Sequence, residues 1–223
     1  MASALVDTQV APLPGQQLLA CVAAQGSAAH PYASSDALLR GGDCARNLAD
    51  LIHFLCVVHG RYPGVIDHAC GRVADEAARA WLTQTAYVFA GERAYVARLA
   101  VAAGPVPSTP GSGESDSAVI GQRHAIEMLA SSERNGCALG TAMALVLDWA
   151  AIRRSLDAAA RRFGVEVPLF PAAEPAPVSA VADAFATAPA VRRALLFGAD
   201  QILVQHYGLW DLLEARALAR AAG

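Results

Sequence analysis

The sequence predicts an all-α fold, a single-domain helical bundle of six to nine helices around a central hydrophobic helix at about residues 137–150. Three observations predict it. Hydrophobic residues make up 55% of the chain, and alanine, the strongest helix former, is the commonest of them. Apolar residues recur at helical spacing in most segments. No segment alternates apolar and polar residues for long enough to form a strand.

The chain of 223 residues is long enough to bury one substantial core, and its organisation follows from its breaker residues. Residues 1–33 are expected to be weakly structured, with at most a short helix at about Leu18–Ala24. The bundle is predicted over 34–223. A Ser/Gly/Pro-rich stretch predicts a flexible loop at 104–116, and a second stretch predicts a Pro-rich connector at 168–177.

Helix-start signals locate the first elements of the bundle. Ser34–Asp36 begins one helix, and Asp43 is expected to cap a strong helix that ends near His59. The helical pattern then continues over about 64–103, which is long for one helix. Breaks or bends are therefore expected at Gly71 and Gly91.

The second half of the chain has the same character. The helical pattern returns at about Ser117 and runs to Phe163, with a bend expected near Asn135–Gly136. Beyond the connector, three helical pieces are predicted, with breaks at Pro189 and at Tyr207–Gly208.

Composition excludes several function classes. The net charge of −3 predicts no nucleic-acid partner, and no apolar run is long enough for a membrane span. All 17 basic residues are arginine, so covalent PLP and a P-loop nucleotide site are excluded for want of a lysine. The five cysteines contain no CxxC pair and predict free thiols. With no secretory signal in view, a cytoplasmic location is expected.

The densest polar cluster flanks the turn that follows the first strong helix. Three of the six histidines fall there within sixteen residues, among carboxylates and a tyrosine. Neutral imidazoles beside carboxylates suit proton transfer or ligand binding near neutral pH. The candidate ligand-binding residues of this cluster are His53, His59, His68, Asp50, Asp67 and Tyr62.

The residues of this cluster could hold either of two cofactors, and neither has a supporting motif. Asp50 and His53 share a helix face at the spacing of a metal-ligand pair, although Arg46 could instead hold Asp50 in a surface ion pair. His59 and His68 could ligate a non-covalent haem between helices. Ordinary core or surface histidines are the alternative, so no metal ligand is assigned.

A polar stripe lies on the helix predicted from Ser117 onward. His124, Glu127, Ser131 and Arg134 recur at helical spacing, so they share one face. Either this face is solvated, or it lines an internal cavity in which His124 and Glu127 form an acid/base pair.

Two aspartates interrupt apolar segments. Asp148 either caps a helix over Trp149–Phe163 or is buried and needs a partner, because a lone buried carboxylate is costly. Asp200 raises the same question, with Arg193 as its candidate partner.

Three blocks carry a family resemblance: Gly104–Gly111, Gln122–Leu129 and Gly136–Trp149. They resemble a small uncharacterised alphaproteobacterial family of helical proteins with no known activity, so the resemblance implies no function. In size and helix pattern the whole chain is also similar to haem-oxygenase-like and ferritin-like bundles, a likeness of architecture without a diagnostic motif.

Two function classes follow. The first is a soluble helical-bundle protein that binds a small molecule or a metal between helices, with the question of enzymatic activity open. The alternative is a non-enzymatic structural or interaction protein that self-associates, for instance as a homodimer, through alanine-rich faces.

Overall fold

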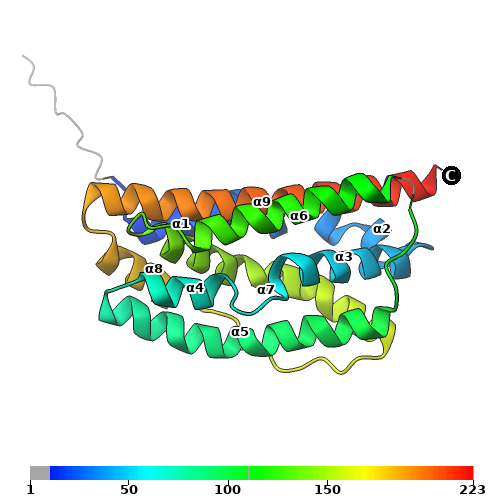
Figure 1. Cartoon of the computed structure of the whole chain (residues 1–223), viewed down its shortest axis with the longest axis horizontal. Helices are drawn as coiled ribbons and strands as arrows, with labels where there is room; N and C mark the ends of the chain where they lie inside the picture. The colour runs from blue at the N-terminus through cyan, green and yellow to red at the C-terminus, as the bar shows by residue number, and fades with distance from the viewer. Residues whose placement is uncertain (1–10, 110, 223) are drawn as a thin grey trace, which may run out of the picture.

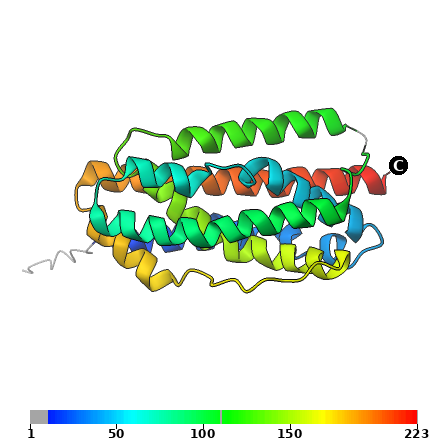
Figure 2. The same ribbon diagram turned by 60° about the horizontal axis from the view of Figure 1, so that its bottom comes forward.

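The computed structural model describes residues 11–109 and 111–222, and every regular element in this part of the chain is a helix (Figure 1, Figure 2). The all-α prediction is confirmed, and the nine α-helices of the described residues lie within the predicted number. The helices and the two short 3₁₀ helices, η1 and η2, are α1 (Pro14–Gln25), η1 (Ser27–Ala29), η2 (Pro31–Ser34), α2 (Asp36–Leu39), α3 (Cys44–His59), α4 (Val65–Arg72), α5 (Glu76–Ala103), α6 (Ser112–Ala130), α7 (Cys137–Phe163), α8 (Pro175–Phe185) and α9 (Pro189–Ala221).

The hydrophobic helix predicted at 137–150 forms the first half of α7, and this helix occupies the centre of the bundle. Nearly all side chains from Cys137 to Trp149 are buried. Helices α3, α4, α5, α6 and α9 all pack against α7, and α9 runs beside it over the greatest length. Among the described residues, no helix combines the length and the apolar character needed to cross a membrane.

Two glycines bring α7 and α9 into backbone contact. A Cβ atom at Gly140 would collide with the backbone oxygen of Leu195, and one at Gly198 would collide with that of Cys137. The hydroxyl of Thr141 donates to the carbonyl of Gly198 across the same contact, at 3.2 Å. The backbones of α7 and α9 therefore meet directly at these two glycines.

The expectation of a weakly structured N-terminus is wrong for its described part. Helix α1 begins at Pro14, earlier than the predicted short helix, and packs against α8 and α9. Its Gly15 lies against Ser179 with no room for a side chain. Residues 1–10, which belong to the same expectation, lie outside the described part of the chain.

Both predicted connecting segments end earlier than expected. Helix α6 starts at Ser112, inside the predicted loop 104–116, and α8 starts at Pro175, inside the predicted connector 168–177. In α8 the proline occupies the first helical turn, where its missing N–H costs nothing.

Two predicted helix breaks are wrong, at Gly91 and at Tyr207–Gly208, because α5 and α9 continue through them. A glycine costs a helix only about 1 kcal/mol relative to alanine, and packing along a long helix outweighs it. Breaks near Gly71 and Asn135–Gly136 are confirmed, since α4 ends at Arg72 and α7 starts after Gly136.

Candidate functional site

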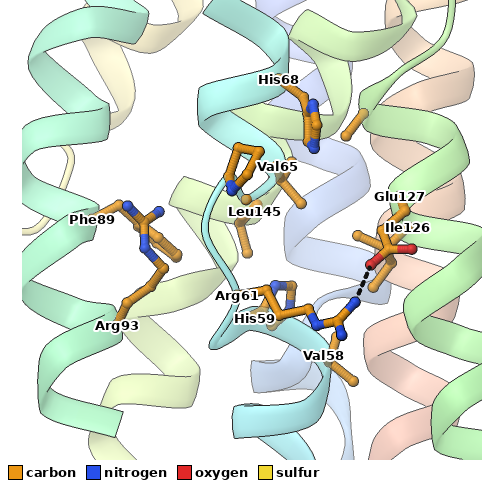
Figure 3. Close-up of a pocket in the computed structure, with 13 residues that line it drawn as sticks. Val58, His59, Arg61, Val65, His68, Phe89, Arg93, Ile126, Glu127 and Leu145 are labelled. Atoms are coloured by element: carbon orange, nitrogen blue, oxygen red, sulfur yellow. Dashed lines mark ion pairs between the residues drawn. The ribbon is translucent and has the colours of Figure 1, made fainter. Parts of the chain in front are cut away.

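A small pocket lies beneath the corner that joins α3 to α4, and we call it the corner pocket (Figure 3). Its cavity of about 20 Å³ has room for about one water molecule. Helices α5, α6 and α7 complete its walls. The lining residues are Val58, His59, Arg61, Pro63, Gly64, Val65, His68, Phe89, Arg93, Ile126, Glu127, Ala130 and Leu145.

A chain of hydrogen-bonded polar side chains runs from this pocket into the core. Nε2 of His59 lies 2.9 Å from Nε2 of His206, and Nδ1 of His206 lies 2.8 Å from the carboxylate of Asp148. The backbone N–H and the hydroxyl of Ser27 both donate to Asp148, each at 2.6 Å. All four side chains are buried, although they come from α3, α9, α7 and η1. We call this array the relay.

The bonding pattern assigns a proton position to each member of the relay. Asp148 accepts both hydrogen bonds from Ser27, so it also accepts the Nδ1–H of His206. Nε2 of His206 is then a lone-pair acceptor for the Nε2–H of His59. This assignment leaves Nδ1 of His59 unprotonated, as the outer proton acceptor of the relay.

Burial and the neighbouring His206 hold the pKa of His59 well below its ordinary value of 6.5. The imidazole of His59 is therefore neutral near pH 7. Its ring packs edge-on against Trp149, with the ring centroids 5.6 Å apart.

Trp149 is fixed by a second buried network. Its Nε1 donates to Glu92 at 2.8 Å, and Arg153 holds the other oxygen of that carboxylate, also at 2.8 Å. Arg153 donates in addition to Asp157 at 2.6 Å. Because both carboxylates are compensated, this network positions the indole ring against His59.

Charged side chains surround the mouth of the corner pocket. Arg61 lies 3.9 Å from Glu127 (Figure 3). Arg123 lies 3.5 Å from the same carboxylate. Arg93 forms a closer pair with Asp67, at 2.8 Å. The Arg61 side chain is 68% exposed, so its pairing with Glu127 is weak.

The structure brings together only part of the predicted site. His59, His68 and Glu127 line the corner pocket. Asp67 and Tyr62 adjoin the pocket through Arg93. The guanidinium of Arg93 pairs with Asp67 and lies over the ring of Tyr62.

Three other predicted residues lie elsewhere. His53 bonds the carbonyl oxygen of Gly104 at 2.9 Å, and the exposed His124 contacts the side chain of its neighbour Arg123. The predicted polar stripe is wrong in its second half, because α6 ends at Ala130 and both Ser131 and Arg134 lie beyond it. Of the two residues on α6, Glu127 reaches the pocket and His124 does not.

The third, Asp50, is part of a buried network away from the pocket. Arg46, its expected surface partner, instead lies near Asp43 at 3.8 Å. Asp50 accepts two hydrogen bonds from Arg216, each at 3.0 Å, and one from Arg220 at 2.6 Å. This arrangement fastens α9 to α3 and needs no metal to explain it.

The helix-cap interpretation of Asp148 is wrong, because the residue lies in the middle of α7 with its carboxylate in the relay. Asp200 bonds the side chain of Gln201, and no ion pair with Arg193 occurs among the described residues. The sequence reasoning missed Ser27 and His206. The available signal was Asp148, a lone carboxylate between Leu147 and Trp149 in an apolar segment. His206 gave no comparable signal, because α9 carries charged residues on both sides of it, among them Asp200 and Asp211.

In the described part of the chain, one group of three side chains could hold a metal ion: His30, Asp211 and Glu214. Nδ1 of His30 accepts the backbone N–H of Tyr32 at 3.1 Å, so Nε2 carries the proton that faces Asp211. A protonated Nε2 has no lone pair for a metal. The geometry therefore favours a hydrogen bond between His30 and Asp211.

The cysteines are free and do not belong to the pocket. Burial raises the pKa of Cys21, Cys56 and Cys70, with Asp200 and Asp67 adding to the effect at Cys21 and Cys70 respectively. Protonated thiols are poor nucleophiles.

The fold and the site together define an all-helical bundle in which a buried carboxylate–imidazole–imidazole relay reaches the wall of a small pocket. The chain belongs to a family of unknown function (DUF6975), whose model matches residues 22–221. Membership of a family without a known activity is thereby confirmed. Neither the curated proteins nor the solved structures gave a match.

Proposed function

We propose that the protein binds a small weak acid at the mouth of the corner pocket, with one acid oxygen in its cavity, and that His59 accepts the proton of the bound acid. The observation that carries this proposal is the relay, which ends at the pocket wall. Burying a carboxylate and two imidazoles carries a desolvation free energy that burying apolar side chains would not carry. A role in proton transfer explains why these groups converge from four elements.

The relay allows a neutral imidazole with a lowered pKa to take up a proton. A proton that arrives at Nδ1 of His59 releases the Nε2 proton of the same ring to Nε2 of His206. The positive charge then lies on His206, beside the carboxylate of Asp148. Placing the charge next to its counterion lowers the cost of burying it.

The mouth of the pocket supports recognition of the acid's anion. Arg61 reaches the pocket and is held only loosely by Glu127, which also has Arg123 as a partner. Arg61 can therefore turn to a bound anion while Glu127 keeps a counterion. Exchanging one weak exposed ion pair for another costs little.

Nitrogen-resolved NMR of the imidazole rings tests the proposal, with sodium acetate as the probe at constant ionic strength. The free protein is expected to show His59 protonated at Nε2 alone. Added acetate should shift the His59 signals and bind more tightly as the pH falls, by at most about tenfold per pH unit for one linked proton.

Variants make the test specific. Arg61→Gln should weaken acetate binding, and His59→Gln should remove its pH dependence. His124→Gln is the matched control, because it makes the same replacement at an exposed site outside the pocket and should bind acetate like the original protein. Equal, pH-dependent acetate binding by a folded His59→Gln variant would overturn the proposal.

A further inference from the structure

A second pocket, which we call the apolar pocket, shares the side chain of Phe89 with the corner pocket. Its volume is about 160 Å³, and it lies between α5, α7, α8 and the connector before α8. Cavities of roughly 150 Å³ with apolar walls can hold a benzene ring. Its lining residues are Trp81, Gln84, Thr85, Val88, Phe89, Val146, Trp149, Phe170, Pro171, Ala173, Glu174, Pro177 and Val178.

Phe89 is the common wall of the two pockets. It lines the corner pocket, where Figure 3 shows it on α5 beside Arg93, and it also lines the apolar pocket. Its ring packs against Trp149, with the centroids 4.7 Å apart, and the indole in turn contacts His59. A proton acceptor and an apolar cavity are therefore separated by two aromatic side chains.

The two aromatic side chains differ in how firmly they are held. Trp149 donates a hydrogen bond to the buried Glu92, so moving its ring would break a polar contact in the core. Phe89 has no polar atom to fix it. One wall of the apolar pocket is the connector, which contributes Phe170, Pro171 and Ala173 without regular structure. Of the two rings, Phe89 is therefore the one whose movement would break no hydrogen bond.

We infer that the ligand is an amphipathic acid with an acidic group joined to an apolar tail about the size of a phenyl ring. The acidic group lies against His59 and Arg61, and the tail occupies the apolar pocket once the Phe89 ring has turned. This inference rests on the proposed function and names the substrate class of the same site. It adds a specificity-determining residue, Phe89, and a volume limit on the tail.

Two probes with the same acidic group separate the contribution of the apolar tail to binding from that of the acidic group. Acetate carries no tail, and phenylacetate carries a phenyl ring. Phenylacetate is expected to shift the His59 NMR signals as acetate does and to bind at least about tenfold more tightly, which corresponds to about 1.4 kcal/mol.

A cavity-filling variant tests where the tail lies. Ala173→Trp fills the apolar pocket from the partly exposed connector and should remove the advantage of phenylacetate without changing acetate binding. Ala172→Trp is the matched control, because the neighbouring residue is exposed and does not line the pocket. It should keep the full advantage of phenylacetate.

The outcomes distinguish this inference from the proposed function. If acetate shifts His59 and phenylacetate binds no more tightly, the inference fails and the proposed function stands. If the advantage of phenylacetate survives in Ala173→Trp, the tail lies elsewhere and the inference fails as well. If neither acid affects His59, both proposals are wrong.

Discussion

Single side chains in the core of this protein are polar where the surrounding sequence is apolar. Asp148 is 2% exposed and His206 is 1% exposed, so each would be costly without the other. Their hydrogen bond and the two bonds from Ser27 satisfy the carboxylate. The energetic cost of removing any member should therefore exceed that of an ordinary surface contact.

Asp148→Asn should lower the free energy of unfolding by about 3 kcal/mol, which is what removing one partner of a buried charged pair typically costs. The amide cannot accept as many hydrogen bonds as the carboxylate, and its NH₂ group would face a donor. Urea unfolding followed by circular dichroism measures the change. Asp200→Asn, on the partly exposed face of α9, is the control and should cost less than about 0.5 kcal/mol.

The lowered pKa of His59 predicts a pH dependence of stability. Below about pH 6.5 the unfolded chain protonates this imidazole while the folded protein leaves it neutral, so the unfolded state binds the additional proton. The stabilising contribution of a neutral His59 is therefore present above this pH and lost as the pH falls. Comparing the original protein with His59→Gln isolates the effect.

The unfolding free energies of the two proteins should converge on acidification from pH 8 to 5.5, with a slope of at most about 1.4 kcal/mol per pH unit. Urea unfolding at a series of pH values gives this difference. A difference that does not change with pH would mean that His59 is protonated equally in the folded and unfolded states.

Between elements, the contact of α7 with α9 leaves no room for side chains at its two glycines. Gly140→Ala or Gly198→Ala should destabilise the protein by about 3 kcal/mol, the upper part of the range for overpacking, because the new Cβ atom meets rigid backbone. Gly91→Ala and Gly121→Ala are matched controls within helices. Nothing lies near a Cβ atom there, so stability should rise by up to about 1 kcal/mol. Thermal unfolding of the four variants makes the comparison.

The Asp50 network predicts a separate effect at the end of α9. Asp50→Ala would leave Arg216 and Arg220 without their buried carboxylate partner, at a cost of about 3–5 kcal/mol. Hydrogen exchange should accelerate most in the last turns of α9, where these arginines lie. Unchanged protection there would show that the network does not hold the C-terminal end of the helix in place.

Across the whole molecule, one hydrophobic cluster extends from α1 to α9. It predicts a single cooperative unfolding transition, with coincident curves from circular dichroism and from the NMR signals of α1, α5 and α9. Separate transitions would show that the chain contains independent units. The expected cytoplasmic location and the alternative of self-association stay predictions, and light scattering addresses the second.

The fold class was predictable because alanine content and helical spacing are local properties. The central helix at 137–150 was predictable for the same reason. The lengths of the helices were harder to predict, because packing along α5 and α9 outweighs the free-energy cost of a glycine within a helix at Gly91 and Gly208. The predicted turn between α3 and α4 pointed to His59 and His68 as candidate site residues, and both line the corner pocket.

The relay itself was beyond sequence reasoning. Ser27 and Asp148 are 121 positions apart, and His59 and His206 are 147 positions apart. Helical periodicity shows which residues face inward, but it does not show which helices meet. Partners at such separations follow only from the packing of the whole bundle.

Trp149 gives this protein an optical reporter of its own. The indole borders the apolar pocket and contacts the outermost imidazole of the relay. A tail seated beside the indole changes the polarity around it and therefore the wavelength of its emission. With Trp81 and Trp210 replaced by phenylalanine, the remaining emission would record occupancy of the apolar pocket as a change of wavelength.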